Sequence, residues 1–133
     1  MTRFAIDSAT LVQLAESSHE VDPDHQLVAP NSIRSLALDV LLQRVRNDEL
    51  SERAAMELHE RMTELKIRLL GDRVSRRTAW RIALEQNLDT IGLAEFVAVA
   101  KLQADALVTS NPELVVVASG VVPLAKFMDL MAR

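Results

Sequence analysis

Short apolar segments alternate with helical patterns along the whole chain. The first apolar run, residues 3–6, stops at Asp7, and Leu11 and Leu14 follow it at helical spacing. Similar runs predict further strands, so the strands that we expect cover residues 3–6, 26–29, 66–70, 106–109 and 121–123. After the helix that follows Asp7, the hydrophobic period predicts helices at residues 33–45, 51–65, 75–86, 93–101, 112–118 and 124–132.

The order of these elements predicts the fold class. Each expected strand is followed by one or two helices, which is typical of a parallel sheet covered on both faces. We therefore expect an α/β fold, a three-layer α/β/α sandwich with a short parallel sheet. The chain shows no internal repeat and no long linker, so residues 1–133 are expected to form a single domain.

Composition narrows the classes of function. The absence of cysteine excludes a disulfide framework, a thiolate zinc site and a cysteine nucleophile. A net charge of −4 disfavours a globally basic nucleic-acid binder but leaves room for a local basic patch. The apolar runs are too short to span a bilayer, and Asp7 interrupts the apolar core that a signal peptide would need. We expect a cytoplasmic protein with no membrane partner.

Four segments, in order, resemble the PIN-domain family, and in particular its small bacterial toxin-type (VapC-like) members. The segments are FAIDSATLVQLAE, LVAPNSIRSLALDVLLQRV, LAEFVAVAKLQADALVTSNPEL and ASGVVPL. The resemblance implies a PIN-like fold. It also implies kinship with ribonucleases that depend on Mg²⁺ or Mn²⁺ and that a cognate antitoxin keeps inactive. In such proteins several carboxylates converge at the carboxyl edge of the sheet to hold the metal ion.

This chain departs from the family pattern at most of the acidic positions. Asp7 matches the first catalytic acid and is the expected metal ligand, whereas Leu36 and Leu93 stand where the resemblance implies Glu and Asp. Asn111 stands at the fourth acidic position, and Thr109 before it matches. The hydroxyl residue expected two positions after Asp7 is replaced by alanine, with a serine shifted by one position. The resemblance therefore implies a degenerate active site.

A reduced metal site remains as an alternative. Asp39 lies three residues after Leu36, about one helical turn along the same helix. A site made of Asp7, Asp39, Thr109 and Asn111 would carry only two carboxylates for a Mg²⁺ or Mn²⁺ ion. Removing negative charge from such a site weakens the binding of a divalent ion, so we expect no metal cofactor unless this alternative holds.

A basic segment is the other candidate for a function. Arg73, Arg76, Arg77 and Arg81 lie close together, and three of them share one stripe if the helix begins early. Such a stripe can bind RNA phosphates without reading sequence. The alternative is a solvated helix face that pairs with Glu85 and other nearby acids. Trp80 can in principle stack on a base, but its alanine neighbours predict that it lies partly in the core.

Two segments suggest protein partners. In toxin-type relatives, the region that corresponds to residues 30–65 binds the antitoxin and forms dimers. The C-terminal segment also carries an apolar stripe of Leu124, Phe127, Met128 and Met131, which is typical of a homodimer or of another protein partner. The sequence does not choose between these two.

The preferred interpretation is a degenerate PIN-domain protein that binds rather than cleaves. Its partner would be RNA, the ribosome or another protein. The first alternative is a weak metal-dependent ribonuclease toxin that uses the reduced site. The second is a structural homodimer or a decoy partner for an antitoxin.

Overall fold

A single parallel sheet lies at the centre of the computed structural model, which describes residues 1–132. The order of its strands is β3-β2-β1-β4-β5, and every neighbouring pair is parallel. The strands are β1 (Thr2–Ile6), β2 (His25–Pro30), β3 (Ile67–Leu70), β4 (Ala106–Val108) and β5 (Leu124–Ala125). The first four confirm the strands expected from the sequence to within a few residues.

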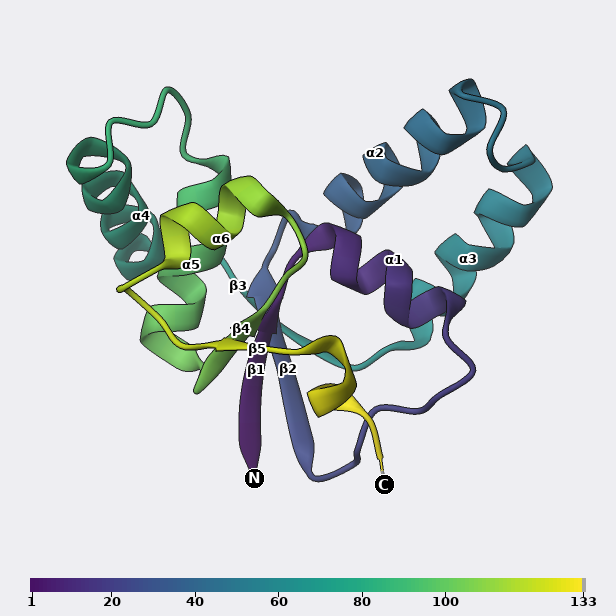
Figure 1. Cartoon of the computed structure of the whole chain (residues 1–133), viewed down its shortest axis with the longest axis horizontal. Coiled ribbons are helices and arrows are strands. Elements are labelled where there is room, and N and C mark those ends of the chain that lie inside the picture. Colours follow the sequence, from purple (N-terminus) through teal and green to yellow (C-terminus); the bar gives the residue numbers. More distant parts are fainter. Residues whose placement is uncertain (133) are drawn as a thin grey trace.

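Helices form a layer on each side of this sheet (Figure 1). One layer contains α1 (Ser8–Glu16), α2 (Ile33–Arg46) and α3 (Glu52–Glu64), which contact one another. The other contains α4 (Arg73–Glu85), α5 (Gly92–Gln103) and α6 (Pro112–Ala118). The expected three-layer α/β/α sandwich with a parallel sheet is confirmed. In the described residues, no helix is long and apolar enough to cross a membrane.

Helix α5 is the centre of the second layer. It contacts β1, β2 and β4 as well as α4 and α6. Because it is covered from several sides, it is apolar almost all round, and its buried residues are Ala94, Phe96, Val97, Ala98, Val99 and Ala100. Their many small side chains let neighbouring elements approach closely.

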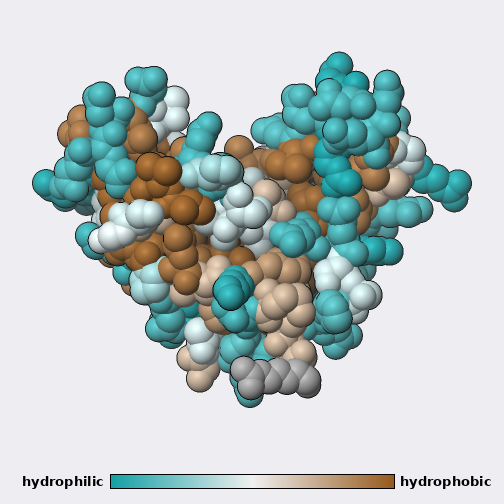
Figure 2. Space-filling view, viewed as in Figure 1, coloured by the Kyte–Doolittle hydropathy of each residue, from teal (hydrophilic) through white to brown (hydrophobic). Residues whose placement is uncertain are grey.

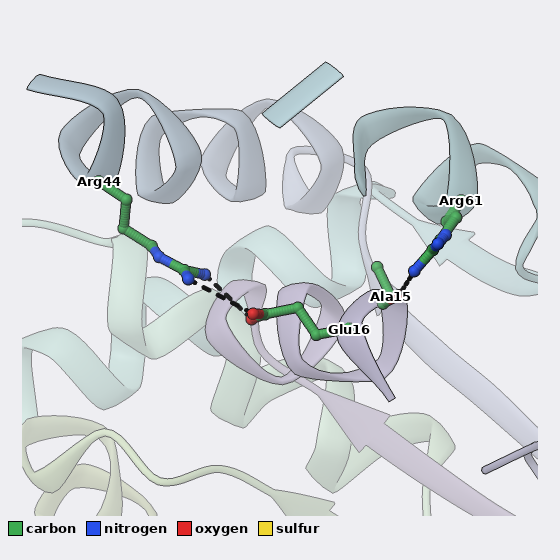
Figure 3. Close-up of polar contacts among 4 residues, drawn as sticks. All are labelled: Ala15, Glu16, Arg44 and Arg61. Carbon is green, nitrogen blue, oxygen red and sulfur yellow. Dashed lines mark hydrogen bonds and ion pairs between the residues drawn. The ribbon is translucent and has the colours of Figure 1, made fainter. Parts of the chain in front are cut away.

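The two groups of helices diverge from the carboxyl edge of the sheet as two arms. Figure 1 shows α2 and α3 in one arm and α4 in the other, and Figure 2 shows a V-shaped hollow between the arms. The first arm is anchored to α1 by two arginines (Figure 3). Arg44 pairs with Glu16 at 3.0 Å, and Arg61 donates a hydrogen bond to the carbonyl oxygen of Ala15 at 3.2 Å.

The predictions for the C-terminal segment were wrong: the last strand lies at another position, and the last helix does not form. The strand β5 is Leu124–Ala125 rather than residues 121–123, although the carbonyl oxygen of Pro123 already accepts from the amide of Leu107 at 2.9 Å. Residues 124–132 do not form a helix, because their first residues pair with β4 instead. Only a short 3₁₀ turn, η1 (Phe127–Leu130), follows.

Candidate functional site

Asp7 lies where the order of the strands reverses direction. It follows β1 directly, and β1 lies between β2 and β4 in the sheet. From β1 the chain continues to β2 and β3 on one side of it, and β4 and β5 are then added on the other side. In open α/β sheets this switch point, at the carboxyl ends of the strands, is where ligands bind. The expected placement of Asp7 at this edge is therefore found in the structure.

The Asp7 carboxylate is buried, and both of its oxygens accept hydrogen bonds. Only 4% of the residue is exposed. Its Oδ1 atom accepts from the backbone amide of Thr10 at 2.9 Å and lies 2.5 Å from the Thr10 hydroxyl. Its Oδ2 atom accepts from the hydroxyl of Thr109. Asp7 thus caps the N-terminus of α1 and links the ends of β1 and β4.

Thr10 is a residue of this site that the sequence analysis did not single out. Its side chain is almost completely buried, and its hydroxyl also lies 3.1 Å from the carbonyl oxygen of Val108. The hydroxyl group beside Asp7 therefore comes from Thr10 on the first turn of α1. The signal in the sequence was the spacing of three residues between an aspartate and a threonine at a helix start, which is typical of an N-cap and its N3 position.

Asn111 is used for capping a helix. Its side-chain oxygen accepts from the amide of Glu113 at 3.0 Å, so it caps α6. Its own backbone amide donates to the hydroxyl of Thr109 at 3.0 Å. Asn111 therefore reaches Asp7 only indirectly, through Thr109.

Asp39 does not share the buried environment of Asp7. The buried row of α2 is Ile33, Ala37 and Leu41, and Asp39 is about 200° around the helix from Ala37. Accordingly, Asp39 is exposed to solvent. Leu36 and Leu93 are half-buried and pack against the core, so the two positions where the resemblance implies carboxylates contribute apolar contacts instead.

The donor set at this edge does not fit a Mg²⁺ or Mn²⁺ ion. These ions need several oxygen ligands, usually including two or more carboxylates. Within residues 1–132, no three side chains of His, Cys, Asp or Glu gather into a group that could hold a metal ion. Asp7 is the carboxylate at the switch point, and both of its oxygens already accept hydrogen bonds from Thr10 and Thr109.

The arginines of the second candidate site lie together on α4. The helix begins at Arg73, as the stripe requires, and Arg73, Arg76, Arg77 and Arg81 are all exposed. Ion pairs in the described part of the chain join other residues, so the alternative pairing of this face with Glu85 is not found. Arg76 donates a hydrogen bond to the carbonyl oxygen of Gly71.

The interpretation of Trp80 as a partly buried residue was wrong. It is 59% exposed. The buried face of α4 consists of Ser75, Ala79, Ile82 and Ala83, and these mostly small residues let α4 pack closely against α5 without room for an indole. Trp80 therefore lies on the solvent side, on the same helix as the four arginines.

Together, the fold and the two sites define a small parallel α/β domain with a buried, hydrogen-bonded aspartate at its switch point and a basic helix face. No protein-family model matches the chain, and no curated protein matches it. Among solved structures, the chain is similar to PAE2754 from Pyrobaculum aerophilum, with a TM-score of 0.70 and 23% sequence identity. The match covers 97% of this chain and 92% of that one. At this identity the similarity shows that the two proteins share a fold.

Proposed function

We propose that this protein is a non-catalytic, PIN-like binding protein of the cytoplasm that binds RNA through the arginine face of α4. The observation that carries the proposal is the placement of four exposed arginines, Arg73, Arg76, Arg77 and Arg81, on a single helix. The environment of Asp7 supports the non-catalytic part, because its oxygens accept hydrogen bonds from Thr10 and Thr109 and no metal-binding group of side chains surrounds it within residues 1–132.

The position of these arginines along α4 supports a role in binding. The first turn of α4 carries no acidic residue and its last turn carries no basic residue. Arg73 and Arg76 lie in this first turn, where the helix dipole is positive and the N-cap carboxylate of Asp72 is the neighbouring acid. An anionic ligand would compensate for the exposed guanidinium groups along the helix. A phosphate backbone is a ligand of this kind.

The binding is expected to be sequence-independent and dependent on salt. If all four arginines contact phosphates of a single strand, log K should fall with log salt concentration with a slope of roughly −3. The measurement is fluorescence anisotropy of a labelled RNA of mixed sequence at several salt concentrations. Binding that does not respond to salt would contradict the proposal.

A matched pair of variants tests the surface. The double variant Arg77→Glu/Arg81→Glu should weaken RNA binding by about tenfold or more, since two attractions become repulsions. The control is Arg46→Glu/Arg53→Glu, which makes the same change in net charge at exposed positions of the other arm. Equal losses in the two variants would show that only total charge matters, and would contradict a site on α4.

The ribonuclease alternative is tested by incubating the protein with the same labelled RNA. We expect the RNA to stay intact in Mn²⁺ or Mg²⁺, because the residues around Asp7 do not form a group that holds a metal ion. Cleavage that EDTA stops and that Asp7→Ala abolishes would replace the binding function with the nuclease function.

A further inference from the structure

A groove with apolar walls lies between α4 and α5, next to the arginine face. Trp80 and Leu84 are 59% and 67% exposed, and Val74 is 58% exposed. Leu102 of α5 closes the other side at 39% exposed. Single exposed hydrophobic residues are ordinary, but four large ones that line one groove mark a binding surface.

The charged residues that line this groove favour a negatively charged partner. Arg77, Arg81 and Lys101 line it together with a single acid, Glu85. A polyanion complements this excess of positive charge. A second copy docked face to face through the same groove would instead bring Arg77 and Arg81 close to their own counterparts, and like charges oppose such pairing.

We propose that the groove binds single-stranded RNA, with one unpaired base stacked on the indole of Trp80 and the neighbouring phosphates on Arg77 and Arg81. This inference rests on the proposed function and adds to it a preference for unpaired RNA. Aromatic side chains bind bases by stacking on their faces, whatever the sequence. Trp80 supplies an exposed aromatic surface beside two guanidinium groups.

The preference for single strands follows from access to the base. In a duplex each base is already stacked between its neighbours, and mainly the phosphates and sugars are presented to a protein surface. Duplex RNA can therefore use the arginines but cannot reach Trp80 with a base. One stacked base is expected to favour the single strand by roughly 5- to 100-fold.

The fluorescence of Trp80 reports on this groove directly. It is the only tryptophan in the chain, and the chain has no tyrosine. The unmodified protein is titrated with a short single-stranded RNA of mixed sequence, with the duplex of the same sequence, and with inorganic polyphosphate, which has phosphates but no bases. We expect the single strand to quench Trp80 strongly, and the other two to bind without comparable quenching.

Two substitutions at Trp80 separate stacking from charge. Trp80→Leu should weaken the binding of labelled single-stranded RNA by roughly 5- to 100-fold and leave polyphosphate binding unchanged. Trp80→Phe keeps an aromatic face and should retain most of the affinity. Met128→Ala, which trims another side chain that is 59% exposed, is the matched control and should bind as the natural protein does. Circular dichroism checks that each variant is folded.

The outcomes distinguish this inference from the proposed function. If Arg77→Glu/Arg81→Glu weakens RNA binding but Trp80→Leu leaves the preference for single strands unchanged, the stacking inference fails and the proposed function stands. If the protein binds neither RNA nor polyphosphate, both fail. If an acidic helical peptide quenches Trp80 and RNA does not, the partner is a protein. If Trp80→Leu converts a dimer to a monomer in sedimentation, the groove is an interface between two copies. The last two outcomes also overturn the inference.

Discussion

The hydroxyl of Thr109 donates a hydrogen bond to Oδ2 of Asp7, and these residues lie 102 positions apart in the sequence. The bond joins the end of β4 to the end of β1, which are neighbouring strands. A buried carboxylate needs such partners, because a buried charge without hydrogen bonds is costly. At the place where α/β folds usually bind ligands, the carboxylate of Asp7 is thus hydrogen-bonded to the chain's own side chains.

Thr109→Val should destabilise the fold by about 1–3 kcal/mol, because it leaves a buried oxygen of Asp7 without its donor. Thr109→Ser keeps the hydroxyl and loses only a methyl group, so its cost should be smaller. Urea unfolding of the three proteins measures the difference. If Val costs little and Ser costs more, the contribution of Thr109 comes from packing of its methyl group, and the hydrogen bond contributes little.

Restoring carboxylates at the two leucine positions tests the resemblance to the PIN family. In metal-free buffer, Leu36→Glu/Leu93→Asp should lower stability, because apolar packing against the core is lost. If the two positions adjoin Asp7, as the resemblance implies, repulsion between like charges adds to the loss. If the two positions correspond to the family's metal ligands, about 1 mM Mn²⁺ should restore part of that stability by binding the folded state. The natural protein should not respond to Mn²⁺.

The control for that restoration is Leu38→Glu/Leu88→Asp, which makes the same changes at two other half-buried leucines. Thermal unfolding with and without Mn²⁺ compares the three proteins. Stabilisation of the control to the same extent would mean that Mn²⁺ binds nonspecifically. No response in the restored variant would count against the alignment of Leu36 and Leu93 with family ligands.

Local sequence patterns were sufficient for most of the fold. Apolar runs that end in polar turns located β1 to β4, and Asp7 could be placed at a strand end because a helix pattern follows it directly. The C-terminal segment was harder, because Leu124, Phe127, Met128 and Met131 have helical spacing. Pairing of Leu124 and Ala125 with β4 overrides that local preference, and such long-range pairing is not visible in a periodic pattern.

The candidate sites were less predictable than the fold. The arginine stripe could be predicted once the first residue of α4 was known, and the N-cap Asp72 sets that first residue at Arg73. The prediction for Trp80 was wrong because its neighbours Ala79 and Ala83 suggested that it shares their buried face. In the structure the small residues face α5, and Trp80 lies on the solvent side of α4. Asp39 follows Leu36 by one turn of α2 but is exposed, whereas Leu36 is half-buried. A pattern with period 3.6 locates a helix more reliably than it fixes which borderline positions are buried.

The cap of α4 predicts a pH dependence in acid. The backbone amide of Ser75, which donates to Asp72 at 2.8 Å, is the main cause that lowers the pKa of Asp72 below its ordinary 3.8, and the charge of Arg76 acts in the same direction. A carboxyl whose pKa is lower in the folded state stabilises the fold above its unfolded pKa. This contribution disappears as the pH falls through the folded pKa.

Asp72→Asn therefore should be less stable than the natural protein near neutral pH, and the difference should shrink as the pH falls from about 5 to about 3. Urea midpoints across this range measure the effect. Asp89→Asn removes an exposed carboxylate that caps no helix and is the control. A difference between Asp72→Asn and the natural protein that stays constant down to the lowest pH would show that charge at the cap plays no part.

Gly71 lies close to Asn31, whose side-chain Cγ would lie 2.8 Å from a Cβ atom at position 71, with its amide nitrogen closer still. The backbone of Asn31 is held beside it, because its amide donates to the carbonyl oxygen of Leu70 at 2.9 Å, but the end of its exposed side chain can turn away. Gly71→Ala should therefore cost about 1 kcal/mol of stability or less. In Asn31→Ala/Gly71→Ala the overlapping atoms are gone, so most of that cost should be recovered in a double-mutant cycle measured by urea unfolding. Additive costs would place the strain in the backbone of residue 71 instead.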